Sequence, residues 1–150
     1  MTEVRTRCVA AIENGTVIDH IPAGVGLAVA FLLDLPASSA QVTIGLSLVG
    51  KKRGLKDLIK IKGKHLTRGE IDRVAILAPG ATINMIRECT VERKFVPELP
   101  AKAIGIFACR NPLCITNHEH AETAFHTEPK EEIVLLRCCY CQRTFIPDHG

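Results

Sequence analysis

Four cysteines in the last third of the chain restrict its fold more than any other feature of the sequence. They form two short-spaced pairs, Cys109-x4-Cys114 and Cys138-x2-Cys141, separated by 23 residues. Two such pairs can enclose one tetrahedral ion, and zinc suits four thiolates because it has no redox chemistry. The sequence therefore predicts one structural zinc per chain, with no open coordination position for catalysis. The alternative is a reduced thiol cluster without metal, or a redox pair.

Other thiols and imidazoles in the chain are not expected to bind this metal. Cys139 lies between two predicted ligands, but the two-residue spacing favours the residue before it. Cys8 and Cys89 fall on predicted strands and are expected to be small buried hydrophobic side chains. Three histidines lack the paired spacing of ligands and are expected at the surface: His118, His120 and His126.

Two prolines, Pro97 and Pro100, divide the chain into parts of different composition. Through Glu98 the chain has 14 basic and 10 acidic side chains, and beyond it 5 and 6, with five of the seven cysteines. Closely spaced prolines favour an extended, stiff linker. We therefore expect two domains, residues 1–98 and residues 99–150. The second, of about fifty residues, has little core, so the metal would supply much of its folding free energy.

Hydrophobic periodicity predicts an α+β fold for the first domain. Helices are predicted over residues 23–33 and from a capping box at residues 67–70 to Pro79. Strands are predicted over residues 5–12, 41–49, 57–62 and 81–95, the last long or broken, with a turn at residues 14–15. The order β-α-β-β-α-β is that of the ferredoxin-like sandwich, an antiparallel sheet with two helices on one face. A small all-β zinc-binding domain follows it.

The composition excludes several classes of protein. A hydrophobic fraction of 47% rules out wholesale disorder. The longest apolar run, residues 23–33, is shorter than the ~20 residues of a membrane span. No basic segment leads into that run, so we expect no secretory signal and a cytoplasmic chain with reduced thiols.

No catalytic constellation is visible in the sequence. No Ser/His/Asp or Cys/His arrangement stands out. A stretch that resembles a phosphate-binding P-loop, residues 45–51, is followed by Lys52 where a magnesium-binding Ser or Thr is needed. We therefore expect the chain not to be an enzyme.

A basic cluster offers a different kind of site. A solvated strand edge would explain it, since lysines protect edges from aggregation. The alternative is a site for a polyanion, because Lys56 and Lys60 share strand parity and project to one side. Lys94 could join them if its strand is a neighbour, and Asp19 and His20 could add a ribose acceptor and a phosphate donor. The cluster comprises Lys51, Lys52, Arg53, Lys56, Lys60, Lys62 and Lys64, opposed by a single acidic residue.

Several segments together resemble the regulatory chain of aspartate carbamoyltransferase. They are residues 16–23, residues 56–61, residues 78–84 and the thiols with residues 138–141. The resemblance implies a non-catalytic subunit of de novo pyrimidine biosynthesis, whose regulatory-chain homodimers join catalytic chains. It implies a nucleotide-binding allosteric domain at which CTP, with UTP, inhibits and ATP activates.

The resemblance also implies a set of contacts. Lys60 is expected at base or ribose, Lys94 at ribose and phosphate, and His20 at phosphate. The zinc domain would hold the catalytic chain through loops near Asn111 and Gln142. Magnesium could accompany the triphosphates, although the sequence offers no carboxylate cage for it. The full nucleotide set is Ala11, Ile12, Asp19, His20, Lys56, Lys60, Asn84, Cys89 and Lys94, with backbone groups near Ala11, Ile12 and Cys89 reading the base edge.

A zinc-ribbon nucleic-acid-binding protein is the alternative function. The charge of residues 99–150 weighs against it, because this part is net negative before the four thiolates are counted. A surface that follows a phosphate backbone needs the opposite sign. We therefore expect neither nucleic acid nor a membrane as a partner.

Overall fold

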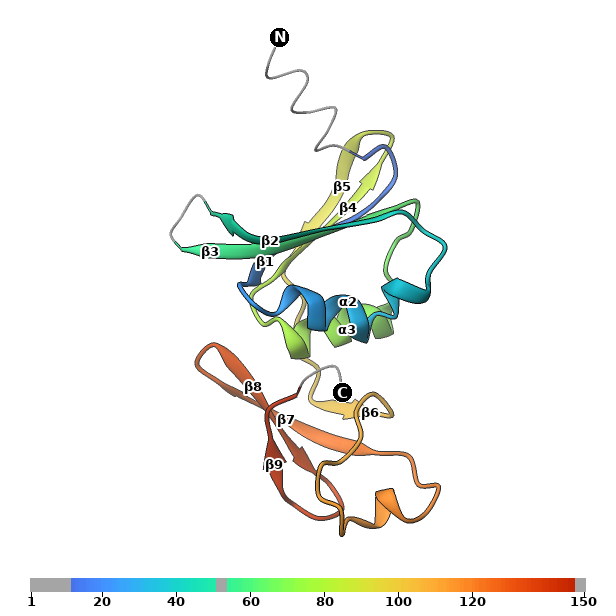
Figure 1. Cartoon of the computed structure of the whole chain (residues 1–150), viewed down its shortest axis with the longest axis vertical. Helices are drawn as coiled ribbons and strands as arrows, with labels where there is room; N and C mark the ends of the chain where they lie inside the picture. Colours follow the sequence, from blue (N-terminus) through green and yellow to red (C-terminus); the bar gives the residue numbers. More distant parts are fainter. Residues whose placement is uncertain (1–11, 51–53, 148–150) are drawn as a thin grey trace.

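The computed structural model describes residues 12–50 and 54–147, which form two β-sheets that follow one another along the chain. Figure 1 shows them as an upper and a lower body joined by an extended linker. The first body contains β1 (Gly15–Pro22), α2 (Gly26–Leu32), a short 3₁₀ helix η1 (Leu35–Ala37), β2 (Val42–Val49), β3 (Leu55–Lys62), α3 (Arg68–Leu77), β4 (Thr82–Arg87) and β5 (Thr90–Phe95). The second contains β6 (Lys102–Ile104), the 3₁₀ helix η2 (Ile115–Asn117), β7 (Ala124–Lys130), β8 (Ile133–Cys138) and β9 (Thr144–Phe145).

The first sheet has the predicted ferredoxin-like topology. Its strands are antiparallel in the order β2-β3-β1-β4-β5, so β3 separates β1 from β2, the two strands that α2 connects. Both helices cover one face (Figure 1). The core between them is formed by fully buried side chains from the central strands and from α3, among them Ile18, Ile59, Ile83 and Val74. The other face of the sheet carries no helix among the described residues.

The first strand that the structure describes, β1, was not among the predicted strands. A turn was predicted at residues 14–15, but Gly15 is the first residue of β1. The predicted strand at residues 5–12 lies, except for Ile12, outside the described residues. Gly15 allows β1 and β3 to approach, because a Cβ there would lie 2.1 Å from the carbonyl oxygen of Ile61. Gly15 therefore permits close strand packing here and does not form the predicted turn.

Two further boundaries differ from the prediction. The helix predicted over residues 23–33 begins only at Gly26, because the chain first makes a turn in which Val25 N–H donates to Pro22 O at 3.0 Å. The strand predicted over residues 81–95 as long or broken is in fact broken into β4 and β5. Glu88 and Cys89 form the turn between β4 and β5, with φ angles of 51° and 64°. Cys89 is therefore exposed in that turn and not buried as predicted.

The capping box begins α3 as predicted. Thr67 Oγ1 accepts the N–H of Glu70 at 3.3 Å, and Glu70 Oε1 accepts the N–H of Thr67 at 3.0 Å. These bonds satisfy donors that the first turn of a helix leaves unpaired. No helix among the described residues is both long and apolar enough to cross a membrane.

The second sheet is the small all-β unit that the sequence predicted. Its order is β6-β7-β8-β9, and its core centres on Phe125, whose ring meets that of Phe145 edge-on at 5.3 Å. Three of the four predicted metal ligands are part of this core. Ile76, from α3 of the first body, is also buried in it, at 1% exposure. The two bodies therefore share hydrophobic packing as well as a linker.

Candidate functional site

The helix-free face of the first sheet carries a row that contains three of the predicted nucleotide-binding side chains. In the strand register, Lys60 of β3 lies opposite Val17 of β1, Val17 opposite Asn84 of β4, and Asn84 opposite Lys94 of β5. The two lysines are thus the ends of one row across the sheet, about 14 Å apart at the backbone for three strand spacings. The sequence analysis expected Lys94 to join the other lysines if their strands were neighbours. β3 and β5 are not neighbours, but strand parity and register place Lys60 and Lys94 on the same face.

One end of this face is built around Asp19. Its Oδ1 lies 2.7 Å from Nζ of Lys56 and accepts the backbone N–H of His20 at 2.7 Å. Partial burial raises the pKa of Asp19, but the Lys56 ammonium and the His20 N–H outweigh burial and hold that pKa below its ordinary value. Lys56 is therefore largely neutralised by Asp19. Among the described residues, no ion pair neutralises Lys60 or Lys94.

His20 lies beside the same carboxylate. Its φ of 58° places it in the left-handed region, and its Nδ1 lies 3.2 Å from Oγ1 of Thr82. Thr82, opposite Asp19 in the register, was not predicted as a site residue. Alternation along residues 82–86 could have revealed it, because Thr82 shares strand parity with Asn84.

The other end of the face is formed by backbone groups. The N–H of Cys89 donates to the carbonyl of Glu13 at 2.9 Å, and the N–H of Glu88 to Oδ1 of Asn14 at 3.2 Å. These bonds join residues 13–14 to the β4–β5 turn, so Ile12 and Cys89 lie at the same end of the sheet. Ala11 lies outside the described residues. Because β1 runs from this end to His20, the face suits an elongated ligand.

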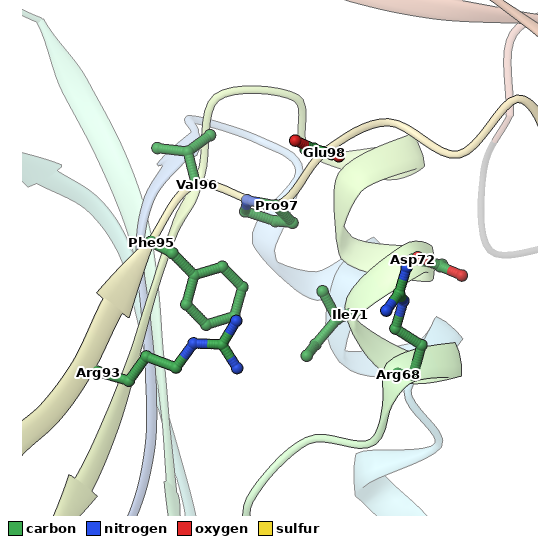
Figure 2. A pocket seen from close by; sticks show the side chains of 8 residues that line it. All are labelled: Arg68, Ile71, Asp72, Arg93, Phe95, Val96, Pro97 and Glu98. Atoms are coloured by element: carbon green, nitrogen blue, oxygen red, sulfur yellow. The ribbon is translucent and has the colours of Figure 1, made fainter.

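A cavity on the other side of the sheet is distinct from this face. Figure 2 shows this cavity, about 340 Å³ in volume, between β5 and α3. Arg93 and Phe95 line it, with the guanidinium carbon 4.3 Å from the ring centroid. Lys94, between them in sequence, points the opposite way because side chains alternate along a strand. The cavity contains none of the predicted nucleotide-binding residues.

The four predicted metal ligands converge in the second sheet. All four Sγ atoms of Cys109, Cys114, Cys138 and Cys141 lie within 4.8 Å of one another. The Cys109–Cys141 and Cys114–Cys138 pairs are each 3.7 Å apart. A tetrahedron with zinc–sulfur bonds of about 2.3 Å has edges of about 3.8 Å. The separations are too long for disulfides, and they fit a tetrahedral thiolate site.

The thiols of this cluster differ in their affinity for protons. Burial raises the pKa of Cys109 to about 12, and the neighbouring thiols add to the effect. Burial also acts on Cys141, but the N–H of Arg143, the Asn111 side chain and the other thiols outweigh it and lower the pKa to about 6. Without metal the cluster holds protons that a cation must displace.

Hydrogen bonds fix the loop that carries the first two thiols. The Asn117 amide donates to the carbonyls of Cys109 and Asn111 at 2.9 and 2.7 Å, and Cys114 Sγ lies 3.2 Å from Thr116 Oγ1. Leu113, at the tip of this loop, is 81% exposed. A rigid loop thus presents an apolar side chain to solvent. Cys139 is outside the cluster, and His118, His120 and His126 are exposed, as predicted.

Comparisons with known proteins agree over nearly the whole chain. Residues 7–98 match the family model of the aspartate carbamoyltransferase regulatory chain, allosteric domain, and residues 102–149 match that of the metal-binding domain. The regulatory chain from Pyrococcus abyssi is 44% identical over 138 residues, covering 91% of this chain and 90% of that one. The one from Vibrio cholerae is 41% identical over 140 residues, covering 93% and 90%.

Proposed function

This chain belongs to the family of aspartate carbamoyltransferase regulatory chains, and on that premise we propose that it binds CTP, UTP and ATP on the helix-free face of its first sheet. Its family models are allosteric and metal-binding domains, so the chain is a regulatory subunit and not itself an enzyme. CTP and UTP inhibit the catalytic partner, and ATP activates it. Magnesium enters only as the counter-ion of the triphosphate.

The observation that carries this proposal is the row from Lys60 to Lys94. Two lysines that have no ion-pair partner among the described residues flank Val17 and the amide of Asn84, so a flat base or ribose can lie against the sheet between the cations. Lys60 contacts the base or ribose, and Lys94 contacts ribose and phosphate. His20 meets the phosphates at one end, and backbone groups of Ile12 and Cys89, with those of Ala11, read the base at the other.

One site can serve effectors of opposite sign. The triphosphate and ribose are common to ATP and CTP, and they engage the same cations. The bases differ in size, so each nucleotide packs differently against the end of the face near Ile12. A ligand shifts the populations of two states only by the difference in its affinity for them. The two nucleotides therefore compete for binding and differ in effect.

The metal in the second domain is zinc and its role is structural. Cys109, Cys114, Cys138 and Cys141 supply four thiolates with separations that suit a closed tetrahedral shell. When bound, the ion cross-links the two loops that carry these thiols. It thereby holds the loop between Cys109 and Cys114 in one conformation.

The zinc domain docks onto the catalytic chain. We assign residues 1–98 to nucleotide binding and residues 99–150 to zinc binding and docking. The rigid loop near Asn111, with exposed Leu113, and the turn at Gln142 form the contact surface. Two regulatory chains pair through their first domains, where β2 is an edge strand with exposed Leu46 and Leu48, a surface that a second copy can cover.

Titration calorimetry with CTP and ATP tests the proposal. Both nucleotides should bind saturably and compete. Lys60→Ala and Lys94→Ala should each weaken binding by about tenfold or more, as expected for a lost contact to a charged group. Lys130→Ala, which removes an exposed lysine of the second sheet, is the matched control and should bind normally. Failure of wild-type protein to bind any ribonucleoside triphosphate contradicts the proposal.

A further inference from the structure

Asp57 is a buried carboxylate that the proposed nucleotide site does not use. It lies on β3 and is 0% exposed, because alternation turns it towards the helices while Lys56 faces the opposite way. The N–H groups of Gly24 and Gly26 donate to its Oδ2 at 3.0 and 2.8 Å, and that of Ser47 donates to its Oδ1 at 2.8 Å. These three bonds, the Asp57 network, satisfy a group whose burial would otherwise be costly.

The Asp57 network joins β3 to two other segments. Gly24 lies in the connection between β1 and α2, which ends at Gly26, the first residue of α2. Ser47 lies in the irregularity of β2, where its φ is 55°. The contact with the connection is close. A Cβ on Gly26 would lie 2.8 Å from Cβ of Asp57, so only glycine permits the approach. β3 and the β1–α2 connection are therefore held together by more than strand pairing.

One side of the Asp57 network adjoins the proposed nucleotide site. Lys56 precedes Asp57 in the chain and pairs with Asp19 at 2.7 Å. Lys60, four residues after Lys56 and on the same face of the strand, is an end of the cationic row. Any displacement of β3 by a bound nucleotide is thus applied next to Asp57.

The other side adjoins the second domain. Pro22, Gly24 and Val25, in or beside the β1–α2 connection, form part of one wall of a cavity of about 330 Å³ between the two bodies. The opposite wall includes Glu132, in the turn of the β7–β8 hairpin, and Ile133, the first residue of β8. Movement of the connection consequently changes what the second domain packs against.

We propose that Asp57 is a positioning residue that transmits nucleotide binding from β3 to the boundary between the domains. The inference rests on the proposed function and concerns the regulation of that same site. While the Asp57 network is intact, the connection moves with β3 as one unit. When it is broken, the strand can respond to nucleotide while the connection keeps its place against the hairpin. Nucleotide then still binds, but its binding no longer acts on the boundary between the domains.

The test uses the complex of this chain with its catalytic chain and CTP as the probe. Asp57→Asn keeps the size of the side chain but replaces one accepting oxygen by a donor, so the Asp57 network loses at least one bond. CTP affinity should stay within about threefold of wild type. The CTP-induced change in half-saturating substrate should fall from about fivefold or more to under about twofold.

Two further variants separate coupling from folding. Gly26→Ala, which pushes the connection away from Asp57, should reproduce the loss of coupling. Thr16→Val is the matched control. It removes a buried hydroxyl that donates to the Lys64 carbonyl at 2.7 Å in the same sheet but leaves the Asp57 network intact, so coupling should persist.

Two of the remaining outcomes contradict this inference, and a third also contradicts the proposed function. Wild-type coupling in both Asp57→Asn and Gly26→Ala would overturn this inference alone. Parallel loss of CTP affinity and coupling in Asp57→Asn would also overturn it, because Asp57 would then support the nucleotide site itself. A wild-type complex that binds no CTP would contradict the proposed function and this inference with it.

Discussion

At the scale of single residues, the helix-free face combines neutralised and free cations. Asp19 is paired with Lys56, so this lysine contributes position more than charge. Lys60 and Lys94 have no ion-pair partner among the residues that the structure describes. His20 adds a ring held beside Thr82. An anionic ligand therefore has two fixed cations to span and an imidazole at one end, which is why phosphate and nucleoside contacts should be separable by mutation.

His20→Ala should weaken CTP more than cytidine. Loss of a hydrogen bond to a charged phosphate corresponds to about 1.5–3 kcal/mol, about tenfold or more in affinity. The nucleoside lacks the phosphate and should be affected little. Competition binding with CTP and cytidine measures the difference.

Thr82→Val is the accompanying control for His20. It removes the hydroxyl 3.2 Å from Nδ1 and leaves the ring in place, so it should reproduce only part of the CTP loss. Equal losses for CTP and cytidine in His20→Ala would remove this residue from phosphate recognition.

At the scale of secondary-structure elements, the thiol cluster stabilises the second sheet, as a larger hydrophobic core stabilises the first. β6 and β9 are only 3 and 2 residues long, and the loop between Cys109 and Cys114 contains no regular strand. Such short elements cannot bury enough surface to hold long loops. The metal site compensates by joining these loops directly.

Cys141→Ser should release the metal and unfold the second sheet while leaving the first intact. The remaining ligands cannot close a four-thiolate shell, so assembly with the catalytic chain should be lost and CTP binding largely kept. Metal content, co-purification with the catalytic chain and CTP titration test the three parts.

Lowering the pH should also weaken metal binding by the thiol cluster. Because the metal must displace protons from thiols such as Cys109, whose pKa is about 12 without metal, the apparent affinity should fall as pH falls. Cys139→Ser, next to the cluster but outside it, is the control and should keep its metal.

Assembly with the catalytic chain that persists in metal-free Cys141→Ser would contradict the structural role of the metal.

At the scale of the whole molecule, α3 belongs to both bodies. Its Val74 is buried under the first sheet, and Ile76, two residues on, is buried in the core of the second. The linker is also fixed, since Thr127 Oγ1 donates to the carbonyl of Pro100. The two domains are therefore coupled through side-chain packing, and substitutions at their boundary should affect the stability of both domains.

Ile76→Ala should destabilise metal retention although it changes no ligand. Truncating a buried isoleucine costs about 2–5 kcal/mol, here taken from the core that surrounds the thiols. The denaturant concentration that releases the metal should fall. Val74→Ala, on the same helix, should instead lower the denaturant concentration at which nucleotide binding is lost and leave metal retention unchanged. Identical behaviour of the two variants would contradict the division of α3 between two cores.

The sequence by itself determined the features that follow from local pattern. Thiol spacing selected the four cysteines that converge, and the capping box selected the start of α3. Alternation placed Lys56 and Lys60 on one face. Each of these depends on residues close together in the chain, so composition and periodicity are sufficient to predict it.

Only the tertiary structure decided which distant residues meet. Strand order brings Lys94 into a row with Lys60 across β1 and β4, and the β4–β5 turn carries Cys89 into solvent. Gly15 begins a strand because β3 passes too close for any Cβ, and Asp57 is buried because donors from the β1–α2 connection and β2 converge on it. Such contacts depend on sheet order and on close approach of backbones, which no spacing within the chain encodes.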